Sequence, residues 1–387
     1  MTMFTPISPE AQEAEPPVAS KPGNPVLHWA LIVVFLGIIF APPVYHEYID
    51  QTRLSHSQFS ELMERPNLDG LHLFESSMIQ HLEINKALRL AFTRLRTRGW
   101  FPPRGVILGR GNILFIMREL DVFAGPSMMA PPPSVGADSL DAIVDFNAQL
   151  RRRGVHMVFL PIPMKLSIYP DAVVGSWTDA DGPALPDDWA PALDHLRQQG
   201  VDVLDLVPLF WKNRNRFSEP LFWKGDTHWS ITGRNLACDE ICRHLLPFIG
   251  GAPRVDFDDV VGTEIHGADM RRFVSEEGLD DLFPDEAFKV HLVLRNGKPF
   301  LGGNNARVLI LGDSYVEIQR DAGWGLEQEL MRRLHIEVQS ICKGGIMVNE
   351  KREELAANPD ALKAKKVVIL ECAGRYFYEA WKRVTLR

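Results

Sequence analysis

The chain of 387 residues is poor in cysteine: it has four, and no two of them form a C-x-x-C pair. Four thiols are too few for a disulfide scaffold, and their spacing does not match the usual zinc or thioredoxin motifs. Cys238 and Cys242 lie four positions apart in a helical pattern, which predicts core positions. Cys342 and Cys372 each end an apolar run, so these two could be neighbours in a sheet.

The chain also lacks an excess of positive charge, with 42 Lys and Arg against 50 Asp and Glu and a formal net charge of -8. A general nucleic-acid binder needs a concentrated Lys/Arg surface to neutralise phosphates, so we expect no nucleic-acid partner. With 45% hydrophobic residues, the composition is that of a globular protein that can bury a substantial core. No internal repeat is present.

Residues 26–44 (VLHWALIVVFLGIIFAPPV) contain no Asp, Glu, Lys or Arg. A helix of this length spans roughly 28 Å, about the thickness of one bilayer core. The preceding residues 1–25, a predicted disordered tail, carry Glu10, Glu13 and Glu15 rather than the short basic leader of a cleaved signal peptide. We therefore expect a single transmembrane signal anchor, with a buried core helix as the alternative.

The charges beside the anchor do not decide its orientation, because Lys21 on one side is matched by Arg53 and Arg65 on the other. Residues 45–104 are predicted to be a helical connector. Its end, HLEINKALRLAFTRLRTRGW, is basic and amphipathic. This stretch could lie on anionic lipid or bind an acidic polymer, or it could be a solvated helix face.

From residue 105 onward, short β-branched runs alternate with helical patterns. Continuous apolar strands are expected where helices cover both faces of a parallel sheet. We predict one three-layer α/β/α domain over residues 105–387, with function on loops at the carboxyl ends of the strands. The predicted strands are 156–163, 201–206, 307–314, 336–341 and 365–372; the predicted helices are 139–154, 190–200 and 325–335; residues 128–138 are an expected exposed loop.

The run RVLILGDSY places Ser314 directly after a predicted strand and before a helical segment. A nucleophilic serine is often held in this position, because its hydroxyl is displayed at the edge of the sheet and the following helix offers N–H groups to an oxyanion. The alternative is that Asp313 or Ser314 only caps the next helix.

The stretch DTHW supplies a candidate base, because Asp226 precedes His228 by two residues. In a Ser-His-Asp relay the carboxylate orients the imidazole, and the imidazole takes the serine proton. A purely structural contact is one alternative, and a metal site is another. Metallophosphoesterases combine Asp-x-His with a Gly-Asn-His type segment, but GGNN at 302–305 lacks the histidine. We therefore favour serine chemistry without a metal or other cofactor.

The pairing of DTHW with a later GDSY resembles the SGNH-hydrolase-like domain of the polysaccharide O-acetyltransferases typified by the alginate acetylation proteins AlgJ and AlgX. The predicted anchor looks like the AlgJ branch. Two features depart from common patterns: the Asp-x-His precedes the serine, as in a circularly permuted SGNH esterase, and Asn112 and Ile113 replace the commoner Gly and Trp. Four further segments look similar to that family and occur in the same order, namely 106–120, 161–171, 201–210 and 367–377.

This resemblance implies an SGNH-like (flavodoxin-like) fold with Ser314 as nucleophile, His228 as base and Asp226 as the orienting carboxylate. Arg375 could serve an oxyanion or could equally pair with Glu371. Further candidate oxyanion donors are the backbone N–H groups of Ser314 and Tyr315 together with Gly344 and Gly345. Candidate sugar contacts are Trp223 and Trp229, although aromatics beside a catalytic loop are as often core.

The resemblance further implies acetyl transfer to hydroxyls of an exopolysaccharide by a periplasmic domain anchored in the bacterial inner membrane. Its implied partners are a multi-pass membrane-bound acyltransferase that supplies acetyl groups and other polysaccharide export proteins. Two alternatives stay open: an acetylesterase with the same triad, and a noncatalytic polysaccharide-binding subunit.

Overall fold

The computed structural model describes residues 105–129, 138–273, 283–344 and 348–386, all within a compact unit that spans residues 89–387. The predicted tail (1–25), anchor (26–44) and connector (45–104) lie outside the described residues, as do residues 130–137 of the predicted loop. Within the described ranges, no helix is both long enough and apolar enough to cross a bilayer.

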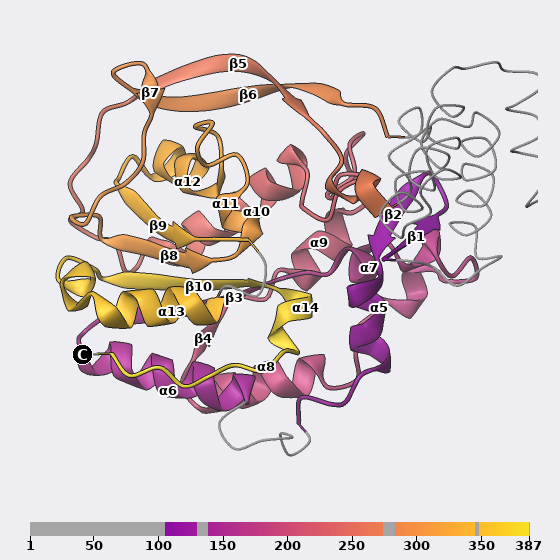
Figure 1. Ribbon diagram of the computed structural model, residues 1–387, viewed down its shortest axis with the longest axis horizontal. Coiled ribbons are helices and arrows are strands. Elements are labelled where there is room, and N and C mark those ends of the chain that lie inside the picture. The colour runs from indigo at the N-terminus through magenta and orange to yellow at the C-terminus, as the bar shows by residue number, and fades with distance from the viewer. Residues whose placement is uncertain (1–104, 130–137, 274–282, 345–347, 387) are drawn as a thin grey trace, which may run out of the picture. The chain divides into compact units, whose positions relative to one another are not determined.

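A five-stranded parallel sheet forms the centre of the domain (Figure 1), which confirms the predicted α/β class. Its strand order is β4-β3-β10-β8-β9. The predicted strands agree with the observed ones to within a few residues, except that β4 is much shorter than expected. The bounds are β3 His156–Ile162, β4 Asp202–Val203, β8 Val308–Gly312, β9 Val338–Cys342 and β10 Val367–Ala373.

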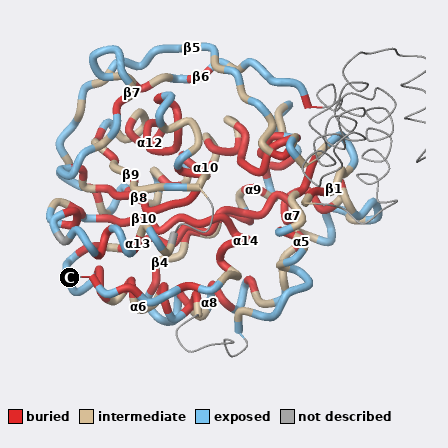
Figure 2. The backbone as a smooth tube through the Cα atoms, in the orientation of Figure 1, coloured by how far each residue is buried: buried red, intermediate tan, exposed pale blue. Residues whose placement is uncertain are grey.

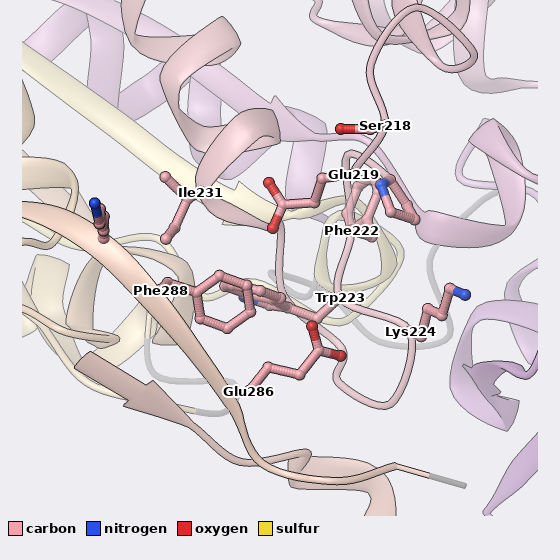
Figure 3. Close-up of a pocket in the computed structure, with 10 residues that line it drawn as sticks. Ser218, Glu219, Phe222, Trp223, Lys224, Ile231, Glu286 and Phe288 are labelled. Atoms are coloured by element: carbon pink, nitrogen blue, oxygen red, sulfur yellow. The ribbon is translucent and has the colours of Figure 1, made fainter. Parts of the chain in front are cut away.

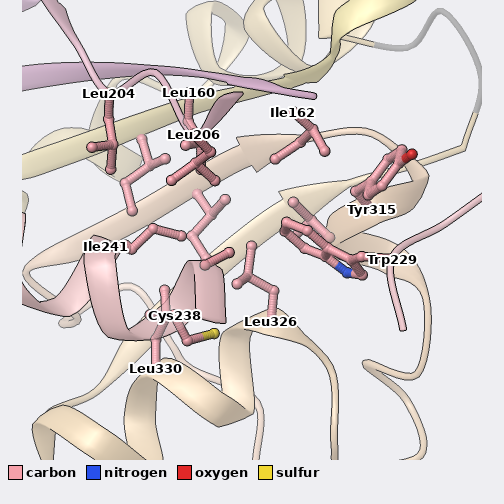
Figure 4. Close-up of a cluster of buried hydrophobic side chains, with 14 of the residues drawn as sticks. Leu160, Ile162, Leu204, Leu206, Trp229, Cys238, Ile241, Tyr315, Leu326 and Leu330 are labelled. Carbon is pink, nitrogen blue, oxygen red and sulfur yellow. The ribbon is translucent and has the colours of Figure 1, made fainter. Parts of the chain in front are cut away.

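Helices cover both faces of this sheet because its strands are apolar on both sides. Val158, Leu160 and Ile162 of β3 pack into a cluster with α10 (Ile231–Leu245) and α12 (Leu326–Leu334), part of which Figure 4 shows. Met157 and Phe159 point the other way. They pack against α6 (Ser139–Arg152), α8 (Trp189–Gln198) and α13 (Val348–Ala357). These two clusters are the two core layers of the predicted α/β/α arrangement.

The cysteines follow the prediction only in part. Cys238 is fully buried in α10, and Cys242 one turn later is partly buried. Cys342 ends β9 and Cys372 lies in β10, but β8 runs between these strands, so the two are not neighbours in the sheet. All four cysteines are free thiols.

A second, antiparallel sheet was not predicted from the sequence. Strand β5 (Asp258–His266) pairs with β6 (Glu286–Arg295) along its whole length, and β7 (Lys298–Pro299) pairs with the end of β6. Figure 2 shows that β5 is mostly exposed, whereas β8 and β10 are buried. Strand β3 is buried as well. An exposed strand lacks the continuous apolar run by which buried strands are predicted. The sequence analysis therefore missed this sheet.

The remaining elements flank the carboxyl ends of the central strands. A hairpin of β1 and β2 precedes α5, and its turn contains Asn112 at a φ of 57°. The bounds are β1 Val106–Gly109, β2 Ile113–Ile116, α5 Met117–Ala124, α7 Lys165–Ile168, α9 Val207–Asn213, α11 Ser314–Glu317 and α14 Gly374–Phe377.

Candidate active site

A short closed loop presents the DTHW motif. Phe222 and Trp229 form an isolated antiparallel bridge, and the N–H of Trp223 donates to the carbonyl of His228 at 3.2 Å. The loop ends at the N-terminus of α10. It is therefore fixed at its base, and its tip holds Asp226 and His228 in a defined geometry.

Asp226 and His228 form a tight buried pair. Asp226 Oδ1 lies 2.6 Å from His228 Nδ1 and also accepts the backbone N–H of His228 at 2.8 Å. Burial alone would raise the pKa of Asp226, but hydrogen bonds from His228 and His266 hold that pKa far below its usual value. His228 Nε2 is buried and has no hydrogen-bond partner among the described residues. The imidazole is thus oriented by an ionised carboxylate, with its second nitrogen free for chemistry.

The candidate nucleophile lies on the turn that follows β8. A side chain at Gly312 would have its Cβ within 2.3 Å of Val316 and 2.4 Å of Glu371, so the turn packs too closely for any larger residue. Asp313 accepts the N–H of Tyr315 at 3.0 Å and caps α11. Ser314 begins α11 and is partly exposed between two buried neighbours. Asp313 is therefore the N-cap of α11, and the Ser314 hydroxyl is not needed for capping.

Tyr315 connects this turn to the closed loop that holds Asp226 and His228, which we call the base loop because His228 is the candidate general base. Its hydroxyl donates to the carbonyl of Thr227 at 2.6 Å, and its ring centroid lies 4.9 Å from that of His228. The indole of Trp229 packs edge-on against the same ring at 5.2 Å. The three predicted triad residues therefore come from adjoining segments at the carboxyl edge of the sheet.

A buried acidic network supports the nucleophile turn. Asp313 Oδ2 accepts the N–H of Ala373 at 2.7 Å, and Glu371 accepts the N–H of Asp313 at 3.0 Å. Burial raises the pKa of the Asp313 carboxyl and raises that of Glu371 well above its usual value, while Arg375 opposes both shifts. Both shifts favour the protonated form of this pair over two charged carboxylates. The network joins the ends of β8 and β10.

Lys165, which was not singled out in the sequence, supports the base loop from below. Its ammonium group is almost fully buried and donates to the carbonyls of Trp223, Lys224 and Asp226 at 2.5, 3.0 and 3.1 Å. Burial lowers the pKa of Lys165 to about 7, and the charges of Glu119, Asp226 and Asp269 oppose that shift. Three carbonyls require three N–H donors, so the protonated form satisfies them all.

We expect Lys165→Met to destabilise the domain by about 3 kcal/mol, since three buried carbonyls each lose a donor at about 1 kcal/mol. Urea unfolding, followed by tryptophan fluorescence, measures this loss. Lys224→Met is the matched control, because the Lys224 side chain is exposed. Equal stability of the two variants would contradict a supporting role for Lys165.

Two further residues missed in the sequence contact Asp226. His266, at the end of β5, places Nε2 3.0 Å from Asp226 Oδ2, and the N–H of Asp269 donates to the same oxygen at 3.2 Å. The carboxylate of Asp269 accepts both the N–H and the hydroxyl of Thr227, at 2.9 and 2.7 Å. Neither residue stands out in the sequence, because both contacts bridge segments about forty positions apart.

The alternative of a metal site has geometric support in only one respect. Asp226, His228 and Asp269 each offer a ligand atom within 4.8 Å of the others. However, hydrogen bonds already occupy both carboxylates and the Nδ1 atom of His228. The GGNN segment packs against the start of β9, where Gly302 approaches the carbonyl of Val338, at the opposite end of the sheet. We therefore interpret the cluster as a hydrogen-bonded network.

The candidate oxyanion donors differ in whether their N–H groups are free to bind an oxyanion. The N–H of Tyr315 already donates to Asp313, and the N–H of Gly344 donates to Glu317 at 2.6 Å, so neither is free as the structure stands. The prediction for Tyr315 therefore needs correction. Gly345 lies outside the described residues. Arg375 is buried beside this edge, and its ion pair is with Glu119 at 3.9 Å.

The two candidate sugar contacts are both buried. Trp229 is 2% exposed and belongs to the main core cluster, so its ring offers no face to a sugar. Trp223 is 7% exposed and forms part of the wall of a cavity of about 500 Å³. Figure 3 shows Glu219 and Glu286 on opposite sides of Trp223 and Phe288 in this cavity. We call this cavity, between residues 218–224 and β6, the β6 groove.

Residues 122–373 match the family described as the SGNH hydrolase-like domain of acetyltransferase AlgX. The match covers more than half of the chain and includes Asp226, His228 and Ser314. The chain belongs to this family. Arg375, by contrast, lies just beyond the matched residues.

Within the AlgX family, the chain is similar to the probable alginate O-acetylase AlgJ of Pseudomonas aeruginosa, at 24% identity over 310 residues, which is 74% of each chain. The solved O-acetyltransferase domain of Pseudomonas putida AlgJ is 22% identical, with a TM-score of 0.53 over 70% of this chain and 92% of that domain. The second comparison shows a shared fold, and this agrees with the SGNH-like sheet described above.

Proposed function

We propose that this protein is a membrane-anchored periplasmic O-acetyltransferase that takes an acetyl group onto Ser314 and transfers it to hydroxyls of an exopolysaccharide. The observation that carries the proposal is the buried His228 Nε2, which has no partner in the described part of the chain and lies beside the turn that holds Ser314. Membership of the AlgX acetyltransferase family supports the choice of acetyl transfer.

In the proposed chemistry His228 takes up a proton and gives it back twice, which makes four proton transfers. Nε2 takes the proton of Ser314 as its oxygen attacks the acetyl carbonyl, and it returns this proton to the leaving group of the donor. An acceptor hydroxyl then attacks the acetyl-serine. His228 removes the hydroxyl proton and returns it to Ser314, which restores the free enzyme. Asp226 stays ionised throughout and stabilises the imidazolium in each step.

The β6 groove suits a polysaccharide acceptor. Its aromatic residues offer apolar surface, while Glu219, Glu286, Lys224 and Lys289 offer both hydrogen-bond acceptors and donors. Such a mixture is typical of a carbohydrate site, because a sugar has apolar ring faces and polar edges. The groove adjoins the base loop through Trp223.

We expect Phe288→Ala to raise the KM for an oligosaccharide acceptor about fivefold, because loss of an aromatic contact costs about 1 kcal/mol. Turnover of a small chromogenic acetyl ester should not change, since that substrate does not need the groove. Val261→Ala is the control, because Val261 is exposed on the neighbouring strand β5. An unchanged KM in the Phe288 variant would exclude the groove as an acceptor site.

The proposed location and partners come from the family and from residues 26–44. An anchor in the bacterial inner membrane would hold the domain close to a multi-pass acyltransferase that delivers acetyl groups and to polysaccharide export proteins. Tethering raises the local concentration of these partners. The acceptor is proposed to be an exopolysaccharide, with alginate as the polymer named in the relatives.

The deciding experiment incubates the full-length protein in detergent with a chromogenic acetyl ester, with and without oligosaccharides of candidate polymers, and analyses products and intact protein by mass spectrometry. Acetylated oligosaccharide together with a protein adduct of one acetyl group would support the proposal. Release of acetate alone, at an equal rate with and without acceptor, would make the protein an esterase. Absence of both products and the adduct would favour a noncatalytic subunit. EDTA should have no effect, because the mechanism uses no metal.

A further inference from the structure

Each oxygen of the Asp226 carboxylate has its own imidazole partner. His228 Nδ1 lies 2.6 Å from Oδ1, and His266 Nε2 lies 3.0 Å from Oδ2. The side chain of Asp226 is 2% exposed and that of His266 is 14% exposed, so water competes little for either contact. The arrangement is a His-Asp-His chain rather than the single pair that the sequence predicts.

His266 has a second side-chain neighbour. The side chain of Gln319 lies 3.5 Å from His266 Nδ1. An ionised carboxylate can only accept, so the proton of the contact between His266 Nε2 and Asp226 Oδ2 is on the histidine. His266 is therefore the hydrogen-bond donor to the second oxygen of Asp226.

The surroundings fix the plane of the His266 ring. Trp223 stacks on it with ring centroids 4.7 Å apart and an interplanar angle of 26°. The charged groups near His266 are Asp226, which it contacts, and Lys224 and Glu286, which line the same small cavity. His228 in turn faces Asp226, Asp269 and Arg375. The ring therefore has one orientation in which it meets both Gln319 and Asp226.

We propose that His266 is a positioning residue of the acetyl-transfer site, which holds the second oxygen of Asp226 as a hydrogen-bond donor and thereby aligns His228 with Ser314. The inference rests on the proposed function, and it makes the β5–β6 ribbon part of the catalytic unit. His266 does not touch the reacting atoms. Its effect passes through Asp226.

The main test compares His266→Phe, which keeps an aromatic ring for Trp223 but removes the donor, with His266→Gln, which can restore one. In His266→Phe we expect kcat for a small acetyl ester to fall about 10- to 100-fold with KM unchanged, because misalignment by a fraction of an ångström is costly. We expect kcat to rise with pH as His228 loses its proton. In His266→Phe the midpoint of this rise should move to higher pH, because Asp226, having lost one hydrogen-bond donor, stabilises protonated His228 more strongly. His266→Gln should recover most of kcat.

Gln319→Leu provides a second variant that leaves His266 and the ribbon in place. Without its partner at Nδ1, the His266 ring can turn away from Asp226, so kcat should fall as in His266→Phe but by a smaller factor. The two variants are thus expected to lower kcat according to how far each disturbs the contact with Asp226. His291→Phe is the control, because His291 lies on the same ribbon and pairs with a different carboxylate, that of Asp259.

The proposal is wrong if His266→Phe and Gln319→Leu keep both the kcat and the pH midpoint of the control, even if their melting temperatures fall, because that result would mark a purely structural role. If the wild-type protein forms no acetyl adduct, the proposed function fails on its own. The positioning role is then tested by NMR titration of His228 in protein labelled at histidine, which needs no turnover. Unchanged titration of His228 in both variants would overturn it.

Discussion

Ser314→Ala is expected to abolish the acetyl adduct and to lower transfer to an oligosaccharide by about 10³-fold or more, as loss of the nucleophile does in enzymes of this mechanism. Ser314 is the residue that carries the acetyl group in the proposed cycle, and His228 Nε2 has no hydrogen-bond partner among the described residues. The fold should be unaffected, because Asp313 rather than Ser314 caps α11. Intact mass after incubation with an acetyl ester measures the adduct.

The matched control is Ser176→Ala, because Ser176 is exposed and lies outside the site. It should keep the adduct and full transfer. An adduct of normal yield in the Ser314 variant would show that acetyl binds elsewhere. Normal transfer without an adduct would instead indicate direct attack of the acceptor on the donor.

Asp226→Asn is expected to lower kcat by about 10³- to 10⁴-fold, because the imidazole loses both its orienting partner and the charge that stabilises the imidazolium. Burial alone would lower the pKa of His228, but the hydrogen bond and charge of Asp226 raise it above the usual value. The reaction needs neutral His228, so wild-type activity should rise as pH passes this raised pKa. Removal of the negative charge should move the residual rising limb to lower pH.

A comparison within the same chain sharpens this test. Asp202 also contacts two histidines, His156 at 2.7 Å and His244 at 2.9 Å, but this cluster includes the start of β3 and lies away from the site. Asp202→Asn should therefore leave kcat and the pH profile unchanged. A loss in the Asp226 variant of less than tenfold, or an unmoved rising limb, would contradict the relay.

The central sheet could be predicted, and the triad residues could be proposed, because both leave local signals. Strands buried on both faces have continuous apolar runs, as in VVILEC, and a two-residue spacing lets Asp226 contact His228 within one loop. The order β4-β3-β10-β8-β9 then brings Ser314 to that loop, and a sheet order of this kind is not written in any single segment. The resemblance to a known family supplied that link.

The supporting residues could not be predicted in the same way. Lys165 lies between apolar residues, and its role depends on three backbone carbonyls about sixty positions away. His266 ends an exposed strand whose sequence has no buried pattern. The amide of Tyr315 was a reasonable oxyanion donor by position, but the side chain of Asp313 two residues earlier already occupies it. Each of these outcomes is set by tertiary packing rather than by local sequence.

The hydrogen bond from the Tyr315 hydroxyl to the carbonyl of Thr227 has a mechanical consequence. His228 and Asp226 lie on one closed loop, so the distance between them changes little when the domain fluctuates. The nucleophile sits on a different segment, and this phenol, next to Ser314 in the chain, bridges the two across a distance that the sheet alone would not fix. Loss of this one hydrogen bond would therefore loosen the approach of the β8 turn to the loop while leaving Asp226 and His228 paired.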